Sequence, residues 1–196
     1  NGFSEGQTVL VFGSTRPGDE ALAAACWKRL RDRFPELRLV IAPRHRERVS
    51  EVLAAFDEPL LLRSRIKDCE RPAGQRVFLL DTVGELAALY GLATVAVIGG
   101  SFYPGVEGHN PLEPAAMGIP TVFGPHMRNF IDPAQALVKR GGARQVASPE
   151  DLYGAIEELL SDPAARARMA EAGRAAIMEN RGAIDRTLEL LAPFLP

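Results

Sequence analysis

The chain has 196 residues, of which 46% are hydrophobic and 24% are charged, so it can form a sizeable core and is not a disordered chain. Its 23 basic and 25 acidic residues give a net charge of -2, which argues against a general nucleic-acid binder. The sequence contains no apolar stretch of bilayer-spanning length, and we expect no signal peptide in it.

Short apolar runs alternate with segments of helical periodicity over most of the chain. Buried strands are predicted at residues 8–12, 37–42, 59–62, 76–80, 94–98, 120–123 and 144–146. Helices are predicted at residues 18–34, 45–56, 84–90, 111–117 and 130–139. Residues 63–75 are polar and irregular, and residues 101–109 form a glycine-rich loop.

The last quarter of the chain is helical and richer in Ala, Glu and Arg. Ser148 is expected to cap one helix, with Pro149 at its first position. Asp162 and Pro163 begin the next helix, and Gly182 is expected to break it before a last helix that ends near Leu191.

This alternation predicts an α/β fold, a doubly wound, Rossmann-like parallel sheet covered by helices on both faces. We expect a single domain over residues 1–196, in which residues 163–196 supply extra C-terminal helices. Ligands of such folds bind outside the carboxyl ends of the strands, near the point where the strand order reverses. The loops at the strand ends are therefore the candidate site.

The segment from Gly108 to Pro114 is the most suggestive of these loops. Asn110 is a good N-cap, and Pro111 presets the first helical turn. The free amides of that turn suit a phosphate, and Glu113 can accept hydrogen bonds from ribose hydroxyls. The alternative is that Asn110 and Glu113 only cap the helix.

Other strand ends carry weaker signals. Arg44 directly follows a strand and can pair with a phosphate or carboxylate, or it can be a solvated arginine. Gly13-Ser14-Thr15 resembles half of a phosphate loop, although a plain turn fits it as well. Residues 81–85 also follow a strand, but they can be a capped helix start with no further role, with Asp81 or Thr82 as the cap.

Metal and nucleophile chemistry find little support in the sequence. The three histidines, His45, His109 and His126, have no metal-ligand spacing, and one or two of them are candidates for neutral hydrogen-bonding groups in the cleft. There is no GxSxG nucleophile motif. Cys26 and Cys69 belong to no paired motif, which favours a reducing compartment over a disulfide or a zinc site.

Taken together, these segments resemble the C-terminal half of the 3-deoxy-D-manno-octulosonic acid (Kdo) transferases, which are GT-B glycosyltransferases of lipopolysaccharide synthesis. The similarity covers nearly the whole chain, and its motifs keep the family's order. The matching segments are Gly13-Ser14-Thr15, Pro43-Arg44-His45, Asp81-Thr82-Val83-Gly84-Glu85-Leu86, Gly99-Gly100-Ser101-Phe102, Gly108-His109-Asn110-Pro111-Leu112-Glu113-Pro114 and Phe123-Gly124-Pro125-His126.

The resemblance implies binding of CMP-Kdo and transfer of Kdo to the lipid A precursor (lipid IVA) without a metal ion or another cofactor. Pro43 and Arg44 would contact the CMP, the loop at 83–85 would hold the cytidine, and residues 110–113 would hold ribose and phosphate. Val83 stands where the family commonly has Met. The implied donor-binding residues are Ser14, Pro43, Arg44, Val83, Gly84, Glu85, Asn110, Pro111, Leu112 and Glu113.

The resemblance also implies a partner domain outside this chain. The family's catalytic carboxylate, its lipid acceptor site and its membrane anchor belong to an N-terminal domain, so no catalytic residue is expected here. The chain is expected to be soluble and to bind the donor without transferring sugar, while the full-length protein lies at the cytoplasmic face of the inner membrane. The last helix of GT-B enzymes often packs on that partner domain, so some apolar residues among Leu188, Leu190, Leu191 and Phe194 are expected to be exposed in this chain.

Two alternatives stay open from the residues alone. The glycine loops and the ribose carboxylate suit another GT-B donor domain that uses a UDP-sugar. A non-catalytic nucleotide-binding domain would have the same loops. A dinucleotide-dependent oxidoreductase is disfavoured, because the GxGxxG fingerprint is missing.

Overall fold

The computed structural model describes residues 7–66 and 74–191, with side chains up to residue 179. At its centre is a seven-stranded sheet in the order β3-β4-β2-β1-β5-β6-β7, and every neighbouring pair of strands is parallel. The strands are β1 (Thr8–Thr15), β2 (Leu37–Pro43), β3 (Leu61–Leu62), β4 (Val77–Leu79), β5 (Val95–Ile98), β6 (Thr121–Phe123) and β7 (Ala143–Gln145).

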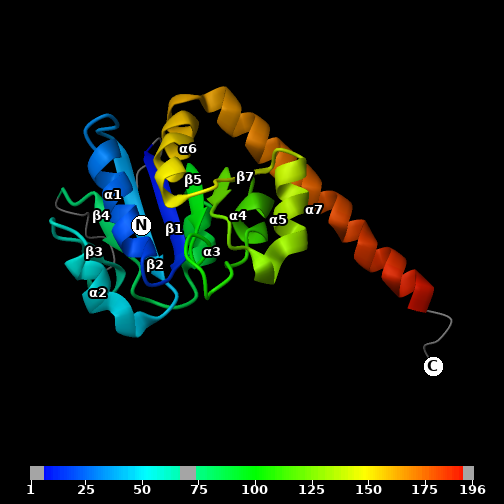
Figure 1. Cartoon of the computed structure of the whole chain (residues 1–196), viewed down its shortest axis with the longest axis horizontal. Helices are drawn as coiled ribbons and strands as arrows, with labels where there is room; N and C mark the ends of the chain where they lie inside the picture. Colours follow the sequence, from blue (N-terminus) through cyan, green and yellow to red (C-terminus); the bar gives the residue numbers. More distant parts are fainter. Residues whose placement is uncertain (1–6, 67–73, 192–196) are drawn as a thin grey trace.

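Helices cover both faces of this sheet, which explains why the strands are apolar on both sides (Figure 1). Leu10 and Phe12 pack in one cluster with residues of α1 and α6, whereas Val9 and Val11 pack on the other face beside Tyr90 of α3. The helices are α1 (Asp19–Leu30), α2 (Val49–Ala54), α3 (Leu86–Tyr90), α4 (Leu112–Ala116), α5 (Ile131–Lys139), α6 (Pro149–Ser161) and α7 (Pro163–Leu191).

The strand order reverses between β1 and β5, because the chain builds the sheet outward from β1 on one side and from β5 on the other. The predicted doubly wound fold is therefore confirmed. The loops after β1 and β5 lie on either side of the switch point, where such sheets bind their ligands.

Trp27 of α1 is part of the main hydrophobic core. Its ring is 1% exposed, and its Nε1 donates a hydrogen bond to Glu58 Oε1 at 2.6 Å. The guanidinium of Arg76 lies 5.0 Å from the ring centroid, within the range of a cation–π contact. Cys26, its neighbour, is also buried, and this burial raises the pKa of the thiol to about 12; Cys69 lies outside the described residues.

Several helices differ from the sequence prediction. Gly182 does not break the last helix: α7 runs from Pro163 to Leu191, since one glycine costs a helix only about 1 kcal/mol. The helix expected at 45–56 is a 3-10 turn at Arg46–Arg48 followed by α2. Among the described helices, none combines the length and the hydropathy of a bilayer-crossing segment. The exposure predicted for Leu188, Leu190, Leu191 and Phe194 concerns side chains outside the described part.

The first half of α7 is attached to the sheet layer by a close backbone contact. A Cβ added at Gly142, just before β7, would lie 2.6 Å from the Cα of Gly173 in α7. Arg174 Nη2 also donates a hydrogen bond to the carbonyl of Met117 at 3.1 Å. Beyond this contact the helix extends away from the domain (Figure 1).

Candidate functional site

The loops after β1 and β5 approach each other closely at the switch point. The amide of Gly99 donates a hydrogen bond to the carbonyl of Gly13 at 2.8 Å. A Cβ at Gly99 would lie 2.5 Å from the carbonyl oxygen of Ser14, so only glycine fits there. Ser14 itself has a φ of 57°, in the left-handed region. This turn brings the backbones that follow the two strands side by side.

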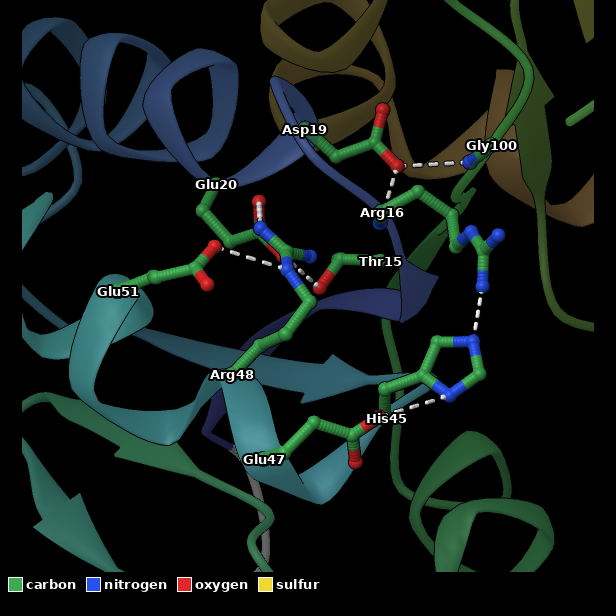
Figure 2. A network of polar contacts seen from close by, with 9 residues as sticks. All are labelled: Thr15, Arg16, Asp19, Glu20, His45, Glu47, Arg48, Glu51 and Gly100. Atoms are coloured by element: carbon green, nitrogen blue, oxygen red, sulfur yellow. Dashed lines mark hydrogen bonds and ion pairs between the residues drawn. The ribbon is translucent and has the colours of Figure 1, made fainter. Parts of the chain in front are cut away.

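Asp19, the first residue of α1, holds both loops together. Its Oδ2 accepts hydrogen bonds from the amide of Gly100 at 2.6 Å and from the amide of Arg16 at 2.8 Å (Figure 2). The side chain is 1% exposed, and Oδ1 has no hydrogen-bond partner among the described residues. Burial raises the pKa of Asp19 to about 6, against the lowering effect of the two backbone hydrogen bonds.

A second buried carboxylate fixes the segment that follows β2. Glu20 accepts a hydrogen bond from Thr15 Oγ1 at 2.8 Å and two from Arg48, at 2.7 and 3.0 Å (Figure 2). Arg48 Nε also donates to Glu51 Oε2 at 3.0 Å. Because Arg48 is engaged on both sides, it ties the start of α2 to α1. The preceding Arg44 and His45 stay exposed beside the switch point, where folds of this kind have their ligand crevice.

Arg16, Arg44, His45 and His109 gather at this crevice, and we call them the cationic cluster. Arg16 Nη1 is hydrogen-bonded to His45 Nε2 (Figure 2), and the amide of Arg44 donates to the carbonyl of Thr15 at 3.0 Å. Within the described part of the chain, neither Arg16 nor Arg44 has a carboxylate partner within salt-bridge distance. The cluster therefore carries positive charge that the protein does not neutralise.

His109 is a half-buried member of the cationic cluster, like Arg16. Burial, together with the charges of Arg44, Arg16 and His45, lowers the pKa of His109 to about 4, so its ring is neutral at pH 7. Its Nε2 is buried and has no hydrogen-bond partner in the described residues, and the same holds for Arg16 Nε. Two polar groups without partners next to unpaired guanidinium groups indicate a site for an anionic ligand.

The predicted helix start at Asn110 is present but differs in detail. Helix α4 begins at Leu112, one residue later than expected, and has five residues. Asn110 Oδ1 accepts the Leu112 amide at 3.0 Å, and its Nδ2 donates to Glu113 Oε1 at 3.3 Å. Pro111 is buried, whereas Glu113 is exposed. Since the first amide of this short helix is already paired, the arginine side chains are the stronger attraction for an anion.

The loop after β4 is organised differently from the capping prediction. Asp81 accepts a hydrogen bond from the amide of Ser64 at 2.8 Å, so it caps the turn after β3 and not α3. Glu85 precedes α3 and pairs with Arg63 at 2.9 Å. Val83, which is 77% exposed, and Gly84, with a φ of 87°, leave their backbone open to solvent.

All ten predicted binding residues thus lie at or just after the carboxyl ends of β1, β2, β4 and β5. Ser14 and Pro43 still belong to β1 and β2, and Leu112 and Glu113 form the first turn of α4. The loop containing Val83 follows β4, two strands from β1, so it lies roughly 10 Å from the turn at Ser14. Sequence reasoning missed the roles of Asp19 and Arg63, because each depends on a contact between distant segments. A carboxylate that begins the helix after a strand-end glycine turn was the available signal for Asp19.

A separate pocket lies at the end of β6. Its volume is about 300 Å³, and Glu107, Met127, Arg128, Ile131 and Gln145 contribute to its wall. It lies outside the cationic cluster, since no member of that cluster lines it. No group of three or more His, Cys, Asp or Glu side chains able to hold a metal ion occurs among the described residues.

Known proteins were compared with this chain. No protein-family model matches it. A 3-deoxy-D-manno-octulosonic acid transferase of Haemophilus influenzae is 35% identical over 195 residues, which cover 98% of this chain and 45% of that protein. The crystal structure of the C-terminal CMP-Kdo binding domain of WaaA from Acinetobacter baumannii matches with a TM-score of 0.80 and 26% identity, over 88% of this chain and 90% of that one.

The C-terminal domain of a group 1 glycosyl transferase, LpcC from Francisella tularensis, shares the fold with a TM-score of 0.60 at 14% identity, over 88% of this chain and 85% of that one. The seven-stranded parallel sheet with its crevice at the switch point is the C-terminal domain fold of GT-B glycosyltransferases. Within that class, the chain is recognised as the counterpart of the C-terminal domain of the Kdo transferases. It spans about 45% of the length of the Haemophilus relative.

Proposed function

We propose that this chain binds CMP-Kdo and serves as the donor-binding half of a Kdo transferase. The observation that carries the proposal is the match to the C-terminal CMP-Kdo binding domain from Acinetobacter baumannii, which extends over 90% of that domain. The unpaired cationic cluster at the switch point supports it, because the donor is anionic.

In this proposal each segment at a strand end binds a different part of the nucleotide. Arg44, exposed at the end of β2, pairs with the phosphate, and Pro43 supports the same contact. The open backbone at Val83 and Gly84 receives the cytosine, with Glu85 fixed beside it by Arg63. The remaining predicted contacts, to ribose and phosphate, fall on Ser14 and on the segment from Asn110 to Glu113.

The chemistry follows from the leaving group. When CMP departs, negative charge develops on its phosphate, and a guanidinium group beside the phosphate stabilises that charge. The exposed Arg44 supplies such a group, and Arg16 adds a second positive charge nearby, without a metal ion. We therefore propose a metal-independent transfer, in which the base that deprotonates the acceptor hydroxyl comes from outside this chain.

The acceptor and the cellular site are part of the same proposal. A lipid A precursor would be presented by an N-terminal domain that also attaches the full-length protein to the cytoplasmic face of the inner membrane. The glycosyltransferase class is supported by the named relatives, whereas these finer assignments depend on the resemblance to the family.

Calorimetric titration with CMP, UMP, UDP and ADP tests the proposal directly. We expect CMP to bind best, and we expect Arg44→Gln to weaken CMP binding at least tenfold, because a charge-assisted hydrogen bond to phosphate contributes about 1.5–3 kcal/mol. The control is Arg128→Gln, which removes the same charge from the separate pocket at β6 and should leave CMP affinity unchanged.

The other outcomes identify the alternatives. Preferential binding of UDP would indicate a UDP-sugar donor domain. Loss of CMP binding in Arg128→Gln but not in Arg44→Gln would place the nucleotide in the β6 pocket and contradict the proposal.

A further inference from the structure

We propose that Arg16 is a specificity-determining residue that binds the sugar carboxylate of the donor, while Arg44 binds its phosphate. This inference rests on the proposed function. CMP-Kdo carries two anionic groups on its anomeric carbon, the phosphodiester and the carboxylate, so its site needs two separate positive groups.

Arg16 and Arg44 are held by different contacts, which fits one of them binding the carboxylate and the other binding the phosphate. Arg44 is exposed and follows β2, where only its amide is fixed, by the carbonyl of Thr15. Arg16 is half-buried and follows β1, its amide is fixed by Asp19, and its Nη1 is bonded to His45 (Figure 2). Arg16 is therefore pre-organised, whereas Arg44 can adjust to its ligand.

The free edge of Arg16 has the geometry that a carboxylate needs. His45 occupies Nη1, which leaves Nε and Nη2 on the other edge of the guanidinium. Nε is buried and unpaired within the described residues, and no described group accepts from Nη2. Two parallel N–H groups on one edge bind a carboxylate with two hydrogen bonds.

His109 completes this site as a neutral neighbour. Its ring lies close enough to Arg16 and Arg44 for both charges to act on it, so it borders both proposed anion positions. Its buried, unpaired Nε2 can donate a hydrogen bond to a ligand oxygen in the Nε2–H tautomer. A neutral ring in this place adds a hydrogen bond without adding a third charge.

Asp19 does not compete with the ligand for Arg16. Its Oδ2 is occupied by the amides of Gly100 and Arg16, and its carboxyl group forms no ion pair with the Arg16 side chain. Glu47 lies 3.5 Å from His45 Nδ1, on the opposite side of the imidazole ring from Arg16 (Figure 2). The guanidinium is thus available to an external anion.

The test compares two probes, CMP and freshly prepared CMP-Kdo, by calorimetry on wild type, Arg16→Gln and Arg16→Lys. We expect Arg16→Gln to change the CMP Kd by less than about threefold and to weaken CMP-Kdo binding by at least about tenfold. Arg16→Lys, which keeps the charge but loses the two-pronged edge, should fall between wild type and Arg16→Gln for CMP-Kdo.

Arg38→Gln is the matched control. Arg38 lies at the start of β2, opposite Val9 in the strand register, and is about five residues, or roughly 16 Å, along the strand from Pro43. The substitution Arg38→Gln therefore removes the same charge at the opposite edge of the sheet. It should leave both affinities at the wild-type value. Circular dichroism of every variant confirms that the fold is retained.

The outcomes separate this inference from the proposed function. If Arg16→Gln weakens CMP and CMP-Kdo equally, or weakens neither, Arg16 does not bind the carboxylate, although the proposed function stands. If wild type binds neither probe, the proposed function fails, and this inference fails with it.

Discussion

A single buried carboxyl group holds the two loops of the crevice in place. Asp19 accepts hydrogen bonds from a backbone amide after β1 and from another after β5. Its carboxyl group is nevertheless buried, and its Oδ1 has no hydrogen-bond partner among the described residues. Positioning the loops therefore costs stability whenever this group is ionised, because the charge is removed from water.

The cost of this arrangement depends on pH. The pKa of Asp19 is about 6 in the folded protein, compared with 3.8 for an unperturbed group. Between these values the folded state binds more protons than the unfolded state, so stability falls as pH rises from about 4 to about 6 and then levels off. The full difference corresponds to about 3 kcal/mol.

We expect Asp19→Asn to remove this pH dependence, because the amide oxygen still accepts the two backbone hydrogen bonds but carries no charge. Urea unfolding at pH 4 and pH 7 should show wild type losing up to about 3 kcal/mol relative to the variant. Asp132→Asn, at an exposed position, gives the baseline for the same loss of charge. An unchanged difference between wild type and Asp19→Asn at the two pH values would contradict the prediction.

At this scale the sequence was a partial guide. It placed Arg44 and Val83 on strand-end loops and Glu113 in the first turn of the helix after a strand, since apolar runs mark where strands end, and the structure puts these segments on one edge of the sheet. Their roles as donor contacts stay predictions. The pairings of Asp19 and Arg63 were not predictable, because they join segments whose proximity only the tertiary fold decides.

At the scale of elements, the strands were predictable because short apolar runs such as 94–98, rich in β-branched residues and followed by glycines, favour buried strands over helices. The ends of the helices were less predictable than the strands. Ser148 and Pro149 start α6 as predicted, but α4 is short and α7 continues through Gly182. The helix penalty of a single glycine is small, so α7 continues through both Gly173 and Gly182.

The contact between α7 and the turn before β7 depends on two glycines. We expect Gly142→Ala to lower the free energy of unfolding by about 1–3 kcal/mol, because its Cβ would lie 2.6 Å from the Cα of Gly173 and backbone atoms yield poorly. Thermal or urea unfolding measures the change.

Gly154→Ala in α6 is the matched control. Nothing lies within 4 Å of the added Cβ, and alanine favours an exposed helix position by about 0.5–1 kcal/mol, so this variant should be more stable than wild type. If Gly142→Ala matched the stability of wild type, α7 would not be held by the close contact.

For the whole molecule, the candidate donor site is formed by strand ends, the segments after them and the starts of α1 and α4, all within one domain. We therefore expect the 196-residue chain to bind CMP-Kdo but to transfer no Kdo to lipid IVA when it is the only protein present. A radiolabelled transfer assay measures this, with a full-length Kdo transferase as the positive control. Transfer by the chain alone would show that the acceptor base lies within it.

Trp27 is the single tryptophan of the sequence, and it lies on α1 eight residues after Asp19, roughly 12 Å along the helix from the crevice. Its emission therefore reports whether α1 remains packed on the sheet. A nucleotide that binds without moving α1 leaves the tryptophan emission unchanged. A variant that has lost ligand binding in calorimetry but keeps the wild-type emission has therefore retained its fold, whereas a variant with altered emission has not.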